Sequence, residues 1–322
     1  MTSGPNAASK SMRAWRVHAF GGPDAMSLEA VKRPEPGPGE VLVQVHAAGV
    51  GPWDAWIRAG RSALPQPLPL TPGSDLAGVV AGIGPEVRGL GLGEAVFGVT
   101  NPRFVGAYAE YALAEAAMIA RMPARLSFQE AASVPVVSIT AWQALFEEAR
   151  LKAGQTVLIH GAGGNVGGYA VQFGRRAGLR VVATASSQDA ALVKELGAEK
   201  VIDYRRQRFE DEIDNVDAVI DLVGGETQAR SFAVLRPGGA LISTVSEPDQ
   251  RQAGERGISA AFFLVAVTSE RLTRIAELLD AGELKTRIGA VLPFSQAWEA
   301  HEMMEDAGRA PKGKIVLQIT GR

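Results

Sequence analysis

Short apolar runs separated by glycine and proline dominate the first third of the chain. β-type residues gather at positions 41–48, 76–83, 94–99 and 108–113, and turn signals such as Pro36-Gly-Pro-Gly39 break the runs. Glycine and proline at these points end strands and open turns. The pattern therefore predicts a compact β-rich domain.

From about residue 127 the pattern changes to an alternation of helices and strands. Helices are expected at 128–132, 140–149, 168–177, 188–196 and 227–235, and apolar strands at 154–160, 180–185, 200–203, 217–221, 240–244 and 262–267. This alternation with short loops predicts an α/β fold with a doubly wound parallel sheet. Helices at 269–280 and 295–304 and a strand at 314–320 follow, and that last strand could return to the first domain.

Length and composition limit the classes of protein. A chain of 322 residues is long for one core, so two domains are expected. The net charge is −2 without a basic block, and no apolar run approaches the ~20 residues of a membrane span, so neither nucleic acid nor a membrane is an expected partner. The first eleven residues lack the apolar core of a signal peptide. Because cysteine is absent, disulfides and thiolate metal sites are excluded, and the cytoplasm is the expected location.

A glycine-rich turn lies between a strand and a helix. Gly161-Ala-Gly-Gly-Asn-Val-Gly167 follows the strand at 154–160 and precedes the helix at 168–177. In this context glycine lets the backbone approach a pyrophosphate, and the helix N-terminus offers N–H donors. The sequence therefore predicts a dinucleotide site, with a plain packing turn as the alternative.

The end of the second strand of this unit bears on the choice of nicotinamide cofactor. An NAD site usually has Asp or Glu there, whereas this strand ends Ala183-Thr-Ala-Ser-Ser187. Small hydroxyls leave room for a 2′-phosphate, and Tyr204 and Arg205 could reach the same edge. NADPH is therefore predicted, although Asp189 opposes that phosphate and Arg205 could be a solvated surface charge.

Seven motifs together suggest a family. They are Gly49-Val-Gly-Pro-Trp-Asp-Ala-Trp-Ile-Arg58, Pro72-Gly-Ser-Asp-Leu-Ala-Gly-Val-Val80, Gly106-Ala-Tyr-Ala-Glu-Tyr111, the run from Leu151 to Gly167, Val201-Ile-Asp-Tyr-Arg205, Asp221-Leu-Val-Gly-Gly225 and Leu235-Arg-Pro-Gly-Gly239. With them the chain resembles the medium-chain dehydrogenase/reductase superfamily, in the zinc-free quinone oxidoreductase branch that includes zeta-crystallin. The match covers residues 13–320.

The resemblance implies a domain plan. Residues 12–126 would form a GroES-like catalytic domain, residues 127–268 a Rossmann NADP-binding domain, and residues 269–322 a connecting helix and a return to the catalytic domain. The active site would lie in the cleft between the domains. The strand at 262–265 would pair across a homodimer.

The resemblance also implies the cofactor contacts. The pyrophosphate would lie against Gly161, Gly164, Val166 and Gly167, the 2′-phosphate near Ser186, Tyr204 and Arg205, and the rest of the cofactor near Val223, Gly224, Val245, Ser246, Phe263 and Leu264, with Thr140 and Lys314 as further contacts.

Three positions depart from the family pattern. Gly51 stands where relatives often have asparagine, and Trp56 replaces a common tyrosine that has been considered as a proton donor. Asn165 replaces a glycine of the phosphate loop, where asparagine would tolerate a left-handed conformation. Asp54 is a candidate catalytic acid, with helix capping as the alternative. Trp53, Trp56 and Phe104 could form a wall for a flat substrate or pack in the core.

No metal is expected. Gly51 to Asp54 and Gly73-Ser-Asp75 stand where the superfamily's alcohol dehydrogenases carry zinc ligands. The four histidines, His18, His46, His160 and His301, do not pair at metal-ligand spacing.

The predicted activity is therefore a zinc-independent transfer of hydride from NADPH to a quinone or a similar conjugated carbonyl. Alkenal or enoyl double-bond reduction, and a non-catalytic NADPH-binding redox sensor, stay open as alternatives. The acceptor pocket depends on loops around residues 52–66 and 100–106, whose shape the sequence does not give.

Overall fold

The computed structural model describes residues 11–306 and 308–320, and contacts divide the chain into two compact units. Unit 1 takes the chain up to Val136 and again from Val267, and unit 2 is Val137–Ala266. Of the first eleven residues, for which no signal peptide is expected, residues 1–10 lie outside the described residues. The domain limits expected from the motifs stay a prediction.

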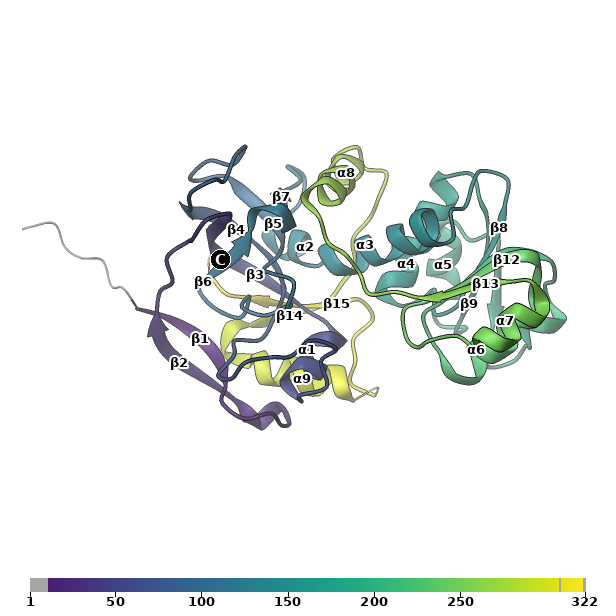
Figure 1. Ribbon diagram of the computed structural model, residues 1–322, viewed down its shortest axis with the longest axis horizontal. Coiled ribbons are helices and arrows are strands. Elements are labelled where there is room, and N and C mark those ends of the chain that lie inside the picture. The colour runs from purple at the N-terminus through teal and green to yellow at the C-terminus, as the bar shows by residue number, and fades with distance from the viewer. Residues whose placement is uncertain (1–10, 307, 321–322) are drawn as a thin grey trace, which may run out of the picture. The chain divides into compact units, whose positions relative to one another are not determined.

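Unit 1 is built on a mostly antiparallel sheet with the order β14-β15-β3-β4-β5-β7, in which β6 also pairs with β3. Its strands are β3 (Glu40–Val50), β4 (Asp75–Ile83), β5 (Ala95–Val99), β6 (Tyr111–Glu115), β7 (Ile119–Arg121), β14 (Ile288–Pro293) and β15 (Lys314–Gln318). A separate antiparallel ribbon consists of β1 (Ser11–Val17) and β2 (Met26–Lys32) (Figure 1). The helices are α1 (Pro52–Arg58), α2 (Phe128–Ala132), α8 (Ser269–Asp280) and α9 (Ala297–Glu305), with 3-10 turns at Pro23–Ala25, Ala116–Met118 and Phe294–Gln296.

The expected return of the last strand is confirmed. β15 pairs antiparallel with β3, so that Ile315 lies opposite Val50. Residues near the end of the chain thereby become neighbours of the loop that follows β3.

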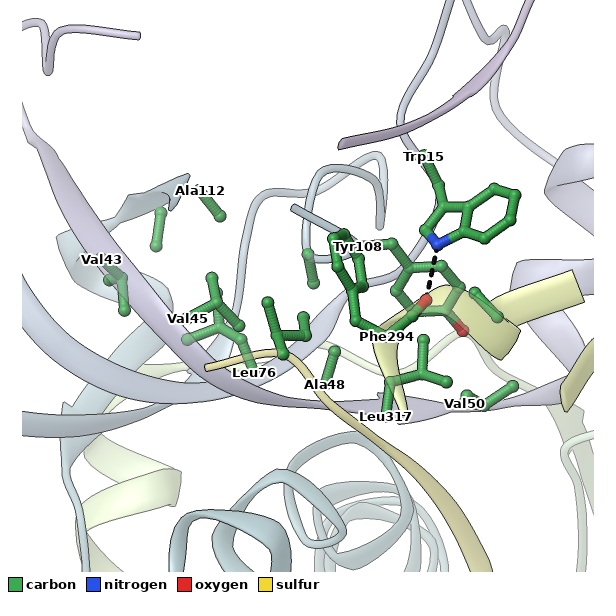
Figure 2. Packing of buried hydrophobic residues seen from close by; sticks show 14 of the residues in the cluster. Trp15, Val43, Val45, Ala48, Val50, Leu76, Tyr108, Ala112, Phe294 and Leu317 are labelled. Atoms are coloured by element: carbon green, nitrogen blue, oxygen red, sulfur yellow. Dashed lines mark hydrogen bonds between the residues drawn. The ribbon is translucent and has the colours of Figure 1, made fainter. Parts of the chain in front are cut away.

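The core of unit 1 forms on one face of this sheet. Val43 and Val45 of β3 and Leu317 of β15 are fully buried and pack with Trp15 and Tyr108 (Figure 2). The indole Nε1 of Trp15 donates to the carbonyl of Phe294 at 2.8 Å, so its polar atom is satisfied inside the core. Each fully buried valine or leucine contributes about 1.5–3 kcal/mol, which makes this cluster a main source of the unit's stability.

Unit 2 carries a six-stranded, fully parallel sheet with the order β10-β9-β8-β11-β12-β13. Its strands are β8 (Thr156–Ile159), β9 (Arg180–Ala185), β10 (Lys200–Asp203), β11 (Val216–Asp221), β12 (Leu235–Ser243) and β13 (Ser259–Phe262). Its helices are α4 (Asn165–Arg176), α5 (Ala190–Leu196), α6 (Gly225–Ser231) and α7 (Gln250–Arg256), preceded by α3 (Pro135–Trp142) and a π-helix (Gln143–Glu148), with 3-10 turns at Phe209–Asp211 and Phe232–Val234. Figure 1 shows α4 and α5 on one side of the sheet and α6 and α7 on the other. The strand order is that of the Rossmann fold, so the predicted α/β class and doubly wound sheet are confirmed.

Several predicted elements of unit 2 differ in extent from the structure; the strand expected at 240–244, for example, begins at Leu235 as β12. The strand expected at 262–267 is β13, Ser259–Phe262, because β12 ends at Ser243, the partner of Phe262, and leaves nothing to pair with later residues. The helix expected at 140–149 is α-helical only to Trp142 and continues as the π-helix. A short apolar run alone does not fix where a strand ends, and the residues that follow Phe262 are partly or largely exposed up to Ala266.

No helix in the described part of the chain combines the length and apolarity needed to cross a membrane.

Candidate functional site

The carboxyl ends of the parallel strands of unit 2 meet at one edge of the sheet. Large apolar side chains left exposed in this unit all lie there, each one or two residues past a strand end, and are 48–61 % exposed: Tyr204 after β10, Val223 after β11, Val245 after β12 and Leu264 after β13. Ligands of open parallel sheets bind at this edge, beside the point where the strand order reverses. The edge is therefore the candidate binding surface of unit 2.

The glycine-rich turn begins directly past β8 at this edge. Gly161 has φ +71°, a conformation that favours glycine, and a Cβ there would lie 3.3 Å from Val223. A Cβ on Gly167 would lie 2.3 Å from the carbonyl oxygen of Gly161, so this glycine allows α4 to pack on the turn. Gly164 is exposed, caps α4, and would bring a Cβ no closer than 3.3 Å to that same oxygen.

The turn fits a diphosphate. The N-cap Gly164 has no side chain to occupy the first amides of α4, which leaves the N–H groups and the positive end of a twelve-residue helix open to an anion. Asn165 is the first residue of α4 and is right-handed, so the tolerance of asparagine for a left-handed conformation is not needed here. Val166, the next predicted contact, is partly buried in the first turn of the helix.

Asp221 organises the loops that follow β11 and β12. Its Oδ1 accepts hydrogen bonds from the amides of Val223 (3.0 Å) and Gly224 (2.8 Å), and its Oδ2 accepts from Ser243 (2.9 Å) and Gln228 (3.0 Å). The Gln228 amide also donates to the carbonyl of Ser246 at 3.0 Å. A Cβ on Gly224 would lie 2.9 Å from Val245.

This network brings four predicted contacts together, Val223, Gly224, Val245 and Ser246. Asp221 belongs to one of the family motifs, but neither it nor Gln228 was among the predicted site residues. The available signal was an acidic residue at the end of a predicted apolar strand.

His160, the last residue before the turn, is a structural residue. Its ring is fully buried and lies 3.0 Å from the hydroxyls of both Thr184 and Ser231. The Ser231 hydroxyl donates to the carbonyl of Thr227, so His160 Nε2 donates to Ser231 and Nδ1 accepts from Thr184. Burial lowers the pKa of His160 to about 4, so the ring is neutral at physiological pH. It ties β8 to β9 and α6 behind the turn.

The residues predicted for a 2′-phosphate follow β9 and β10. Ser186 is buried and donates its hydroxyl to Asp189 Oδ2 at 2.7 Å. Asp189 also lies beside the glycine turn, because a Cβ on Gly163 would be 3.0 Å from its Cβ. Tyr204 and Arg205 are exposed, with the guanidinium 5.7 Å from the ring centroid. The cation of Arg205 and the hydroxyl of Ser186 that were predicted for a 2′-phosphate are thus present, but the Asp189 carboxylate is hydrogen-bonded to that hydroxyl.

The segment after β13 is fixed by the π-helix. The Gln143 side chain accepts a hydrogen bond from the amide of Ala266 at 3.0 Å and donates to Glu148 at 3.1 Å. It thereby holds the non-strand segment that contains Phe263, which is partly buried, and Leu264. Thr140 is buried one turn earlier in α3. π-Helical turns occur often at functional sites.

Asp54 lies in unit 1, in the first turn of α1. Its carboxyl is fully buried, and Oδ2 accepts hydrogen bonds from the amide of Gly51 (2.8 Å) and the hydroxyl of Tyr108 (3.3 Å). Oδ1 has no hydrogen-bond partner among the described residues. Burial raises the pKa of Asp54 to about 7. The contacts are those of the capping role given as the alternative in the sequence analysis.

Lys314 takes part in a buried ion pair of unit 1. Its Nζ lies 2.9 Å from Asp75 Oδ2 and 4.3 Å from the ring centroid of Trp53, and both charged side chains are at most 2 % exposed. Asp75 Oδ1 accepts from the amide of Val136 at 3.1 Å. Burial raises the pKa of Asp75, and the Lys314 ammonium opposes this rise. Asp75 was not among the predicted site residues, and its pairing with Lys314 was not expected.

The three aromatic residues proposed as a wall differ in exposure. Trp53 donates its indole N–H to the hydroxyl of Ser74 at 2.9 Å, Trp56 is 50 % exposed on α1, and Phe104 packs against the core of unit 1. Asp54, Trp56 and Lys314 belong to unit 1, as do Trp53 and Phe104, whereas the other predicted cofactor contacts belong to unit 2.

Over residues 11–306 and 308–320, no three His, Asp or Glu side chains come together as a set that could hold a metal ion. The predicted independence from zinc stays a prediction.

Comparisons with known proteins agree with this architecture. The family described as alcohol dehydrogenase GroES-like domain matches residues 37–124, and that described as zinc-binding dehydrogenase matches residues 196–317. Quinone oxidoreductase of Homo sapiens is 34 % identical over 328 residues, covering 96 % of this chain and 98 % of that protein. The chloroplastic NADPH-dependent alkenal/one oxidoreductase of Arabidopsis thaliana is 31 % identical over 323 residues, covering 96 % and 80 %.

Among solved structures, the quinone oxidoreductase from Coxiella burnetii matches with a TM-score of 0.89 at 33 % identity, covering 97 % of this chain and 100 % of that chain. The predicted GroES-like and Rossmann-like parts are therefore both present. The chain belongs to the medium-chain dehydrogenase/reductase superfamily of oxidoreductases, in its zeta-crystallin-like quinone oxidoreductase branch.

Proposed function

We propose that this protein is an NADPH-dependent, zinc-independent reductase that transfers hydride to a quinone or a similar conjugated carbonyl compound. The observation that carries the proposal is the carboxyl edge of the unit 2 sheet, where an open glycine turn and the N-terminus of α4 adjoin exposed apolar side chains. Such an edge suits a ligand that combines a diphosphate with flat rings. The human relative is named for quinones and the Arabidopsis relative for NADPH and alkenals, which supports the cofactor and the acceptor class.

In this proposal the amides at the start of α4 bind the diphosphate, and the small residues Gly161 and Gly164 allow its close approach. Val223, Val245 and Leu264 shield the ring end of the ligand from water, and Asp221 holds the loops of the first two. When bound, a reduced nicotinamide supplies the hydride. Thr140, Val166, Gly167 and Phe263 stay predicted contacts.

The preference for NADPH rests on Arg205. Its guanidinium is exposed past β10 and matches the charge and geometry of a phosphate. The Ser186–Asp189 hydrogen bond acts in the opposite direction, because a carboxylate repels that phosphate. We therefore propose a preference for NADPH over NADH rather than exclusion of NADH.

Asp54 and Trp56 have positioning and contact roles in the proposal. Asp54 fixes the Gly51 amide and the start of α1, and the half-exposed ring of Trp56 on that helix offers a flat surface for the acceptor. Because the Asp54 carboxyl is fully buried, we propose that the proton that accompanies the hydride comes from solvent.

We also propose a homodimer through β13, because it is the strand at the edge of the parallel sheet and an edge strand can pair with a second copy.

The alternatives are reduction of an alkenal double bond, supported by the Arabidopsis relative, and cofactor binding without turnover. A panel of quinones, enals and saturated aldehydes, assayed with NADPH and NADH side by side, separates them. We expect oxidation of NADPH with conjugated acceptors and little with saturated aldehydes. If the protein binds NADPH but no acceptor causes its oxidation, only the hypothesis of cofactor binding without turnover remains.

A further inference from the structure

A groove of about 480 Å³ opens on unit 1, and none of its lining residues is among the proposed catalytic or cofactor-binding residues. Gln66 and the part of its lining at 101–106 come from the loops expected to shape the acceptor pocket. Its walls come from the β1–β2 ribbon, the segment 66–71, the segment 101–106 and β6. The volume lies within the range of small-ligand sites.

The charged side chains that line the groove are all positive. Arg16, Lys32 and Arg103 line it, and none of its lining residues is Asp or Glu. A fourth cation, Arg33, stacks on the lining residue Tyr111 with its guanidinium carbon 3.7 Å from the ring centroid. The chemistry of these walls favours an anion.

Arg16 is held in place by neutral oxygens. It is partly buried, and its guanidinium donates to Thr71 Oγ1 at 3.2 Å and to the carbonyl of Pro69 at 3.0 Å. These bonds fix the group without cancelling its charge, and a guanidinium has further N–H donors for a ligand. Glu29 on β2 interacts mainly with other side chains. Its pKa is lowered chiefly by hydrogen bonds from Ser27 and His18, and the charge of Arg16 contributes least.

The remaining wall is largely apolar. Pro34, Pro67, Leu70, Val105 and Leu113 line the groove beside the cations. A simple inorganic anion would leave this surface uncovered, whereas a molecule with an apolar tail would cover it. The chain's own residues 1–10 do not suit the groove, because their one charged side chain is Lys10.

We infer that this groove binds a small amphipathic carboxylate, with its carboxylate among Arg16, Lys32 and Arg103 and its aliphatic tail along the proline-rich wall. The inference goes beyond the proposed reductase activity and does not require it.

Calorimetry on the full chain tests the inference, with sodium octanoate as the probe below its micellar range. We expect saturable binding of one octanoate per chain, and weaker binding by about three- to tenfold in each of Lys32→Gln and Arg103→Gln, since each removes one charge-assisted contact. Lys152→Gln, which removes an exposed lysine of unit 2, is the matched control and should bind as the wild type does.

Two further probes test the two halves of the ligand. Octyl glucoside has the tail without the charge, and acetate has the charge without the tail, so both should bind at least tenfold more weakly than octanoate. The inference is overturned if octanoate gives no saturable heat, if both groove variants keep the wild-type affinity, or if either probe matches octanoate.

Discussion

Replacing Gly164 by alanine separates cofactor binding from folding. Gly164 has φ −80°, which any residue adopts, and an added Cβ would meet only the carbonyl oxygen of Gly161, at 3.3 Å. The same methyl group would stand at the mouth of the turn, where the proposal puts the diphosphate. Gly167 offers no such test, because its Cβ would lie 2.3 Å from backbone and disturb the turn itself.

The substitution should change the free energy of NADPH binding far more than the free energy of unfolding. Exchange of an N-cap glycine for alanine lowers the free energy of unfolding by about 1 kcal/mol or less. Loss of two amide hydrogen bonds to a charged diphosphate removes about 3–6 kcal/mol of binding free energy, at roughly 1.5–3 kcal/mol each. The dissociation constant of NADPH should therefore rise by about two to four orders of magnitude.

Fluorescence titration with NADPH measures the affinity, and chemical denaturation measures the stability. Gly168→Ala is the matched control, because it adds the same methyl group one turn into α4, at 3.5 Å from Leu196. It should bind NADPH as the wild type does. A Gly164→Ala protein that binds NADPH within threefold of the wild type would refute the placement of the diphosphate.

Three further predictions concern other side chains. The wild-type protein should lose stability between about pH 4 and pH 7, because the buried Asp54 carboxyl has its pKa raised to about 7 and its ionisation above the pKa of the unfolded state costs roughly 4 kcal/mol at saturation. In Asp54→Asn this pH-dependent loss should disappear. Denaturation at several pH values measures the effect, and equal pH profiles of the two proteins would contradict it. Lys314→Met should lower the free energy of unfolding by about 3–5 kcal/mol, because it leaves Asp75 buried without its cation. Adding Asp75→Asn to the same chain should restore part of that free energy. If the effects of the two substitutions on the free energy of unfolding simply add, the pair is not coupled. Gln143→Leu removes the hydrogen bond to the amide of Ala266, so it should speed amide hydrogen exchange in the segment after β13 and raise the KM for NADPH. The free energy of unfolding should fall by only about 1 kcal/mol. Unchanged amide exchange would contradict the positioning role of Gln143.

Structural features that depend only on residues close together in the sequence could be predicted from the local sequence pattern. The turn from Gly161 to Gly167 was predictable because its strand, its glycines and its helix follow one another directly. The strand at 41–48 and the helix at 269–280 were predictable from their own periodicity, and both exist as β3 and α8.

Features that depend on distant residues were not predictable in this way. Lys314 and Asp75 are 239 positions apart and meet only because β15 returns to β3. The hydrogen bond from Tyr108 to Asp54 likewise depends on folding of unit 1. The strand predicted at 262–267 failed for the same reason, since its length is set by where β12 ends.

A single-turnover experiment tests the central claim most directly. The metal-free wild-type protein is mixed without oxygen with one equivalent of NADPH and one of a naphthoquinone, and nicotinamide absorbance and hydroquinone are followed together. We predict loss of the reduced nicotinamide with formation of one equivalent of hydroquinone, and no such enzyme-dependent reaction with Gly164→Ala. Persistence of the reduced nicotinamide on protein that demonstrably binds it would contradict the account.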